Sequence, residues 1–262
     1  MSQIKRPVRV VAVTGGANGI GAACVRLFAE RGDSVAILDR DAAAAQAIVS
    51  ECPSSRFIAV DVADSASVRS AFAEIDDAFG RIDVLVNSAG IESRELLATM
   101  TDDSWDRVID VNLKGTMLCT QAAAQIMRRE GTGGSVVVVA SVAGKRISFS
   151  GGVAYTASKG GVLGFTRHAA FELAADRIRV NAVCPGPTLT PMILRNLTPE
   201  RIEAVVDTVP LGRWVQPVDI AYAVEFLAGP GASMCTGTSI EIDGGVMVSN
   251  GSRYEDYFAA RR

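Results

Sequence analysis

Hydrophobic residues gather in short runs that alternate with amphipathic stretches along most of the chain. Seven runs rich in Val and Ile are predicted to be strands, at residues 8–13, 34–38, 56–60, 83–86, 135–140, 179–183 and 239–242. Nearly continuous apolar runs are typical of parallel strands covered on both faces, and the stretches between them have helical patterns. We therefore predict an α/β fold with three layers, in which helices cover both faces of a doubly wound, seven-stranded parallel sheet with right-handed crossovers.

The chain is expected to form a single domain, because 262 residues suit one large α/β unit and neither a repeat nor a low-complexity linker interrupts the pattern. The longest irregular stretch runs from Pro185 to about Pro210. It is too long for an ordinary connection, so we predict that it is a binding segment.

Composition excludes several classes of protein. Hydrophobic residues make up 48% of the chain and charged residues 21%, with a net charge of -3, which disfavours disorder and nucleic-acid binding. No apolar run approaches the roughly 20 residues that span a bilayer, and the start runs into a strand rather than a cleavage site. We therefore expect a cytoplasmic protein without membrane association.

Cysteine and histidine usage argues against a metal site. The five cysteines are odd in number, widely spaced and in apolar surroundings, as expected of reduced thiols in a core. His168 is the only histidine, and it lies about half a helical turn away from the face of Tyr155 and Lys159. We predict no metal, and a packing or surface role for this histidine.

A glycine-rich stretch, TGGANGIG at residues 14–21, follows the first predicted strand and opens a helix. Gly15, Gly19 and Gly21 allow a tight turn and a close approach of the backbone to a pyrophosphate, which the helix N-terminus would hold. Asp39 ends the second strand, where a carboxylate accepts ribose hydroxyls and repels a 2′-phosphate, so NAD is favoured over NADP. Arg40 follows and could instead meet that phosphate, which leaves NADP open.

Tyr155 and Lys159 are four residues apart, so a helix places them on one face. A cation about 4 Å from the phenol contributes on the order of 4 kcal/mol at an effective dielectric constant of ~20. We expect this to lower the tyrosine pKa by up to about 3 units, which would suit the phenol to acid/base work on an alcohol or ketone.

Further motifs surround this pair in order along the chain: NSAG at residues 87–90, VIDVNLKG around Asn112, VVVVASVAG ending beyond Ser141, and VCPGPTLTPM after the sixth strand. Together the motifs resemble the short-chain dehydrogenase/reductase family over nearly the whole chain, from Val8 to Gly245. The resemblance implies a Rossmann-type fold with a cofactor half at about 1–150, a catalytic and substrate half at about 151–250, and a tail at 251–262. It also implies an oxidoreductase that interconverts a secondary alcohol and a ketone.

The resemblance assigns roles to the matching residues. Tyr155 would be the acid/base, Lys159 would lower its pKa and hold the nicotinamide ribose, Ser141 would bind the substrate oxygen, and Asn112 would position a relay water. The cofactor site would further comprise Gly15, Asn18, Gly19, Ile20, Gly21, Asp39, Arg40, Asp61, Val62, Asn87, Ala89, Gly90, Pro185, Gly186, Thr188 and Thr190. A homotetramer is also implied, built through the helices that carry Asn112 and Tyr155 and the C-terminal segment.

Two departures from the family pattern stand out. Ser141 and Tyr155 are 14 residues apart, one more than usual, and NSAG replaces the commoner double asparagine. Two other functions also remain open, namely an NADP(H)-dependent ketone or 3-oxoacyl reductase and a cofactor-binding regulator without catalysis.

Charged residues on two loops suggest what the small-molecule substrate is. Lys145 and Arg146 follow Ser141, and Glu92, Arg94 and Glu95 follow Gly90, so we hypothesise a polyhydroxylated or anionic substrate. Tyr254, Tyr257 and Phe258 give the tail aromatic anchors, which suggests that it packs across a subunit interface.

Overall fold

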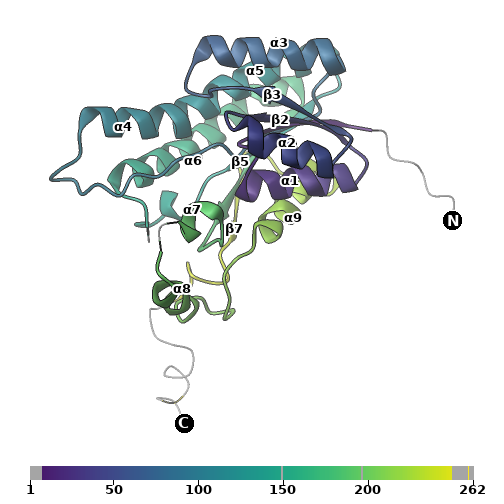
Figure 1. Ribbon diagram of the computed structural model, residues 1–262. Helices are drawn as coiled ribbons and strands as arrows, with labels where there is room; N and C mark the ends of the chain where they lie inside the picture. The colour runs from purple at the N-terminus through teal and green to yellow at the C-terminus, as the bar shows by residue number, and fades with distance from the viewer. Residues whose placement is uncertain (1–7, 149, 196, 250–258, 260–262) are drawn as a thin grey trace.

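A single parallel sheet organises the part of the chain that the computed structural model describes, residues 8–148, 150–195, 197–249 and 259. Its strand order is β3-β2-β1-β4-β5-β6-β7 (Figure 1). The strands are β1 (Val10–Thr14), β2 (Ser34–Asp39), β3 (Ser55–Ala59), β4 (Val84–Asn87), β5 (Gly134–Val139), β6 (Ile178–Pro185) and β7 (Ser239–Ile242). The predicted doubly wound sheet is therefore confirmed, with each strand end within two residues of its predicted position.

Helices cover both faces of the sheet. One face packs against α1 (Gly19–Glu30), α2 (Ala42–Glu51) and α9 (Pro217–Ala228). The other packs against α3 (Ser65–Phe79), α5 (Gly115–Glu130) and α6 (Val153–Leu173). The helix α4 (Asp102–Ile109) precedes α5, and three short 3₁₀ turns lie at Val142–Gly144, Ala174–Asp176 and Pro230–Ala232.

The apolar runs form two cores because successive side chains of a strand point to opposite faces. In β5, Val136 and Val138 belong to the core under α3, α5 and α6, whereas Val137 and Val139 belong to the core under α1, α2 and α9. All four are buried, and full burial of such a side chain contributes about 1.5–3 kcal/mol. Both faces are thus apolar, which explains why the sequence shows runs rather than alternation.

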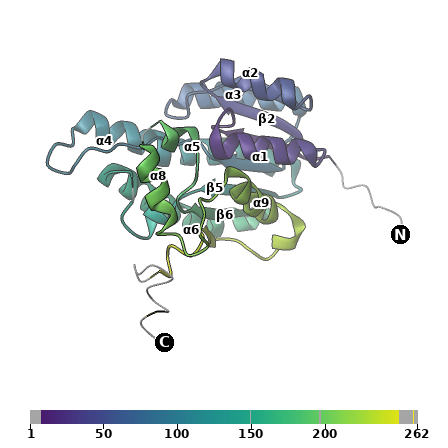
Figure 2. The same cartoon turned by 60° about the horizontal axis from the view of Figure 1, so that its bottom comes forward.

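The predicted irregular stretch from Pro185 to about Pro210 contains two short helices, α7 (Pro191–Leu194) and α8 (Pro199–Val206). Each begins with a Thr-Pro pair: Thr190 and Thr198 cap the first turns with their side chains, and Pro191 and Pro199 occupy the first helical positions. Proline is favoured there because that N–H has no partner within the helix. The two helices lie outside the three layers: α8 is at the lower end of the fold in Figure 1, below α7, and it comes toward the viewer in Figure 2.

Candidate active site

A cavity of about 620 Å³ opens where β1, β4, β5 and β6 end. Its walls include Gly15 and Asn18 after β1, Ser88 to Gly90 after β4, Ser141 after β5, and the segment from Pro185 to Thr190 at the end of β6. The strand order reverses between β1 and β4, so the cavity lies at the switch point where doubly wound sheets bind ligands.

The glycine turn prepares one end of this cavity for an anion. Asn18, Gly19 and Ile20 line the cavity at the start of α1, and the Asn18 side chain makes no capping hydrogen bond there. The first N–H groups of a helix have no partner within it and attract anions. Gly21 is required for packing, because a Cβ there would lie 2.0 Å from the Gly15 oxygen.

A second, smaller cavity of about 140 Å³ adjoins the glycine turn. Asp39, Arg40, Asp61 and Val62 line it together with Ala89 and Gly90. The Asp39 carboxylate is fixed by the backbone N–H groups of Ala17 (3.0 Å), Arg40 (2.7 Å) and Asp41 (3.0 Å). The Arg40 guanidinium lies 3.5 Å from the Asp61 carboxylate. Anion-binding N–H groups next to a fixed carboxylate fit the pyrophosphate and the adenosine ribose of a dinucleotide.

Tyr155 and Lys159 lie on one face of α6, as predicted, and both line the large cavity. The Lys159 ammonium is 5.7 Å from the centre of the Tyr155 ring and donates a hydrogen bond of 2.8 Å to the Val139 carbonyl at the end of β5. Lys159 is buried and Tyr155 half-buried. The strand end therefore orients the lysine beside the phenol.

The pKa of Tyr155 differs from expectation. Burial raises this pKa, a hydrogen bond with Ser141 lowers it, and the negative charge of Glu92 raises it further, so the net direction is upward. Burial lowers the pKa of Lys159 to about 8. The sequence spacing predicts the proximity of the pair but contains no information about desolvation, which is the largest cause of the pKa shift of both groups.

Ser141 follows β5 and forms part of the cavity wall between Ala140 and Val142. Its hydroxyl accepts a hydrogen bond of 3.0 Å from the N–H of Ala143, which caps a short 3₁₀ turn. The additional residue between Ser141 and Tyr155 leaves both residues in the lining of the same cavity. Ser141 and Tyr155 are two of the four predicted catalytic residues.

Asn112 occupies a π-helical turn, Asp110–Lys114, between α4 and α5. Its side-chain oxygen accepts a hydrogen bond of 2.8 Å from the N–H of Ile91. Its side-chain nitrogen donates hydrogen bonds of 2.9 Å to the carbonyl of Ile91 and of 3.0 Å to the Ser158 hydroxyl. A Cβ added to Gly90 would come 3.4 Å from the Asn112 side-chain oxygen and 3.6 Å from the Lys159 ammonium. Asn112 thus joins the loop after β4 to α6, and π-helical turns are frequent at functional sites.

Most of the predicted cofactor residues meet at the two cavities. Pro185, Gly186, Thr188 and Thr190 line the large one. Gly21 and Asn87 are exceptions, because neither lines a cavity. Asn87 is buried, and its side chain donates a hydrogen bond of 3.0 Å to Thr120. Its neighbour Ser88 lines the large cavity instead.

Four of the five predicted substrate-loop charges line neither cavity, namely Arg94, Glu95, Lys145 and Arg146. The Lys145 ammonium pairs with Glu241 and donates 2.8 Å to Ser239, and the Arg146 guanidinium donates 3.3 Å to the carbonyl of Val246. Both side chains turn toward the C-terminal part of the fold, and neither lines the cavity. Glu92 does line it.

Several cavity residues were not singled out from the sequence. Ser148 and Ser150 line the cavity beside Tyr155, and one face of α8 with its flanks contributes Leu197, Arg201, Ala204, Val205 and Thr208. Trp214 supports this face, since its ring N–H donates 2.8 Å to the carbonyl of Ile202. The sequence shows that these α8 positions are three or four residues apart and share one face of a helix, but it does not show that this face lines the cavity.

Other predictions concern residues outside the cavity. His168 is exposed and hydrogen-bonds Glu172 at 3.0 Å. All five cysteines are free thiols. Among the described residues no cluster of His, Cys, Asp or Glu could hold a metal, and no helix is long and apolar enough to cross a membrane. The tail residues Tyr254, Tyr257 and Phe258 lie outside the described part of the chain.

Known proteins are similar to this chain in sequence and in architecture. A family model described as "Enoyl-(Acyl carrier protein) reductase" matches residues 15–247. The chain is 38% identical to (3R)-3-hydroxyacyl-CoA dehydrogenase from Homo sapiens, over 94% of this chain and 99% of that protein. It is 37% identical to D-threitol dehydrogenase from Mycolicibacterium smegmatis, over 92% and 93% of the two chains.

A solved structure agrees with these sequence relatives. The crystal structure of a short-chain type dehydrogenase/reductase from Mycobacterium marinum has a TM-score of 0.87 and 32% identity, and the match covers 92% of this chain and 96% of that chain. The chain therefore belongs to the short-chain dehydrogenase/reductase family, whose members carry out pyridine-nucleotide-dependent oxidoreduction of alcohols and ketones.

Proposed function

We propose that this protein is an NAD-dependent dehydrogenase that interconverts a secondary alcohol and a ketone. The observation that carries the proposal is the meeting of Ser141, Tyr155 and Lys159 on one cavity with the uncapped start of α1. When bound, the nicotinamide ring takes up or returns the hydride and, in its oxidised form, adds a positive charge.

The chain's own groups would handle the proton. During oxidation the Tyr155 oxygen accepts the proton of the substrate hydroxyl, and during reduction it donates one to the ketone. The Ser141 hydroxyl hydrogen-bonds the same substrate oxygen and the phenol. Lys159 would hold the nicotinamide ribose beside the phenol, and Asn112 holds the loop after β4 against α6 so that these groups keep their positions.

The cofactor would lie across the two cavities. The N–H groups near Asn18, Gly19 and Ile20 would hold the pyrophosphate, and Asp39 would accept the adenosine ribose hydroxyls. Preference for NAD is supported by the fixed Asp39 carboxylate, which would repel a 2′-phosphate, and by the proximity of Arg40 to Asp61. The NADP(H)-dependent reductase is the second candidate, because Arg40 still lines the ribose cavity.

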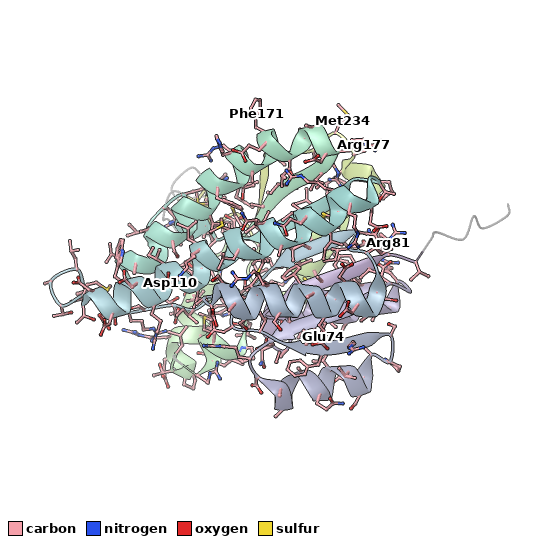
Figure 3. All side chains as sticks on the ribbon, turned by 90° about the horizontal axis from the view of Figure 1, so that it is seen from above. Glu74, Arg81, Asp110, Phe171, Arg177 and Met234 are labelled. Atoms are coloured by element: carbon pink, nitrogen blue, oxygen red, sulfur yellow. The ribbon has the colours of Figure 1, made fainter. Side chains whose placement is uncertain are left out.

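Assembly and location are proposed from surface and thiol chemistry. Val218, Tyr222 and Phe226 form an exposed apolar stripe along α9, and Phe171 and Met234 project outward at the upper edge of Figure 3. Such apolar groups support a homotetramer, whose mass light scattering would measure. Five free cysteines support a cytoplasmic location, where thiols stay reduced.

The test is the reduced-nicotinamide absorbance of purified protein with NAD or NADP and a panel of secondary alcohols, sugar alcohols, hydroxy acids and cyclic diols. Turnover with NAD that exceeds turnover with NADP at least tenfold supports the proposal, and the reverse preference favours the reductase. Cofactor binding without turnover of any alcohol or matching ketone would favour a regulator.

A further inference from the structure

One corner of the cavity is distinctly polar. Glu92 after β4, Ser141 after β5, Ser148 and Ser150 in the loop before α6, and Tyr155 on α6 all line it, and we call these five residues the polar corner. The wall formed on and around α7 and α8 is mainly apolar, with Met192, Ile193, Leu197, Val205 and Trp214, and it also contains Arg201 and Thr208. A substrate with a polar end and an apolar end would complement these two sides.

Glu92 is built into the polar corner rather than lying loosely at its edge. Its side chain is only 9% exposed, the Ser150 hydroxyl donates 3.1 Å to one carboxylate oxygen, and the Arg94 guanidinium lies 3.4 Å from the other. Ser148 helps to shape the Ser150 loop by accepting hydrogen bonds from the N–H groups of Ser150 (3.3 Å) and Gly151 (2.8 Å). The carboxylate thus has a fixed position on the cavity surface.

The charge of Glu92 acts on the reacting region. It is one of the groups that raise the pKa of Tyr155, so its field reaches the phenol. An ionised carboxylate only accepts hydrogen bonds, and it offers about four acceptor positions. A substrate substituent that faces it gains a charge-assisted hydrogen bond if it is a donor and is repelled if it is an anion.

We propose that Glu92 determines substrate specificity by binding a second hydroxyl or an ammonium group near the carbinol carbon that Tyr155 serves, and by excluding a carboxylate from that position. This inference rests on the proposed dehydrogenase function. It narrows the polyhydroxylated or anionic substrate that the loop charges suggested to one whose reacting end is a diol or amino alcohol. The other end of the substrate faces the apolar wall.

The experiment compares three four-carbon substrates with NAD: butane-2,3-diol, butan-2-ol and 3-hydroxybutanoate. We expect kcat/KM of the wild-type protein to favour the diol over butan-2-ol at least tenfold. Glu92→Leu, which is similar in size but accepts no hydrogen bond, should reduce that ratio below threefold. Glu92→Gln, which removes the charge alone, should raise kcat/KM for 3-hydroxybutanoate at least tenfold.

Glu203→Gln is the matched control, because Glu203 is an exposed residue of α8 outside the cavity lining, and it should keep the wild-type ratios. Thermal midpoints of all variants identify one that has failed to fold. A diol preference of Glu92→Leu within twofold of the wild-type value would overturn the inference, as would wild-type protein that shows no preference for the diol.

Binding separates this inference from the proposed function. In Tyr155→Phe protein with NAD, the rise in thermal midpoint caused by the diol should exceed that caused by butan-2-ol, and Glu92→Leu on this background should remove the difference. That result without wild-type turnover would contradict the dehydrogenase and retain Glu92 as a donor-binding residue. Equal rises for both alcohols would contradict the role of Glu92.

Discussion

The two walls of the large cavity are built in different ways. The wall at the strand ends is attached directly to the sheet: Val139 in β5 accepts the hydrogen bond of Lys159, and Asn112 joins the β4 loop to α6. The wall of α7 and α8 lies outside the layers and is supported by contacts such as that of Trp214 with the carbonyl of Ile202. The first wall carries the groups proposed to transfer the proton together with Glu92, whereas the second wall would contact the rest of the substrate.

The variant that distinguishes the roles of the two walls most clearly is Tyr155→Phe. Removing the phenolic oxygen should lower kcat by about 10²–10⁴-fold, the usual contribution of a positioned acid/base. The dissociation constant of NAD, measured by fluorescence titration, should stay within about threefold of the wild-type value. Retention of more than a tenth of the wild-type kcat would remove Tyr155 from the proton transfer.

Asp39→Ser examines the smaller cavity that adjoins the glycine turn. Loss of the carboxylate removes its repulsion of a 2′-phosphate, so the ratio of kcat/KM for NAD to that for NADP should fall by about 10- to 100-fold. Steady-state kinetics with both cofactors measure the ratio. Asp41→Ser serves as the control because Asp41 caps α2 without lining either cavity, and it should leave the ratio unchanged.

Trp214→Phe examines the α7–α8 wall. The substitution keeps an aromatic ring but removes the hydrogen bond to Ile202, which contributes about 1 kcal/mol in a typical case. KM for the alcohol should rise about three- to tenfold while kcat stays within twofold. A fall in kcat with unchanged KM would mean that this wall also participates in the chemical step.

The last prediction concerns the pH dependence of stability. Lys159 has a pKa of about 8 in the folded chain and 10.5 as its ordinary value, so between these values the unfolded chain binds more protons. The contribution of Lys159 to stability should therefore rise by up to about 3 kcal/mol as the pH increases from about 8 to 10.5. Tyr155 and the buried thiols of Cys24 and Cys119, whose pKa values burial raises, have the opposite pH dependence in both proteins. Lys159→Met should lose this rise in urea unfolding measured at several pH values, and an identical pH dependence in both proteins would contradict the lowered pKa.

How much the sequence predicts also differs between the walls. Gly15, Ala89, Ser141 and Pro185 each follow or end a strand, and parallel strands bring their carboxyl ends to one edge, so their meeting follows from the strand order. The strand-end wall was therefore largely predictable. In the α7–α8 wall, the Thr-Pro pairs at Thr190 and Thr198 are typical helix starts, although this stretch was predicted to be irregular.

Contacts set by loop packing were not predictable. Lys145 is four residues from Ser141, yet its side chain crosses to Glu241 on β7. Glu92 and Ser150 are 58 residues apart and meet only because two loops fold over Tyr155. The raised pKa of Tyr155 depends on burial in that same region, a quantity that residue spacing does not contain.

The most direct test of the central claim is the pH dependence of kcat/KM for alcohol oxidation. Burial raises the pKa of Tyr155, and the unprotonated phenol is the form that accepts the proton. The account therefore predicts that oxidation accelerates as the pH rises into the alkaline range, and that this rise is absent from the residual activity of Tyr155→Phe. A flat wild-type profile, or the same rise in the variant, would contradict the claim that Tyr155 transfers the proton.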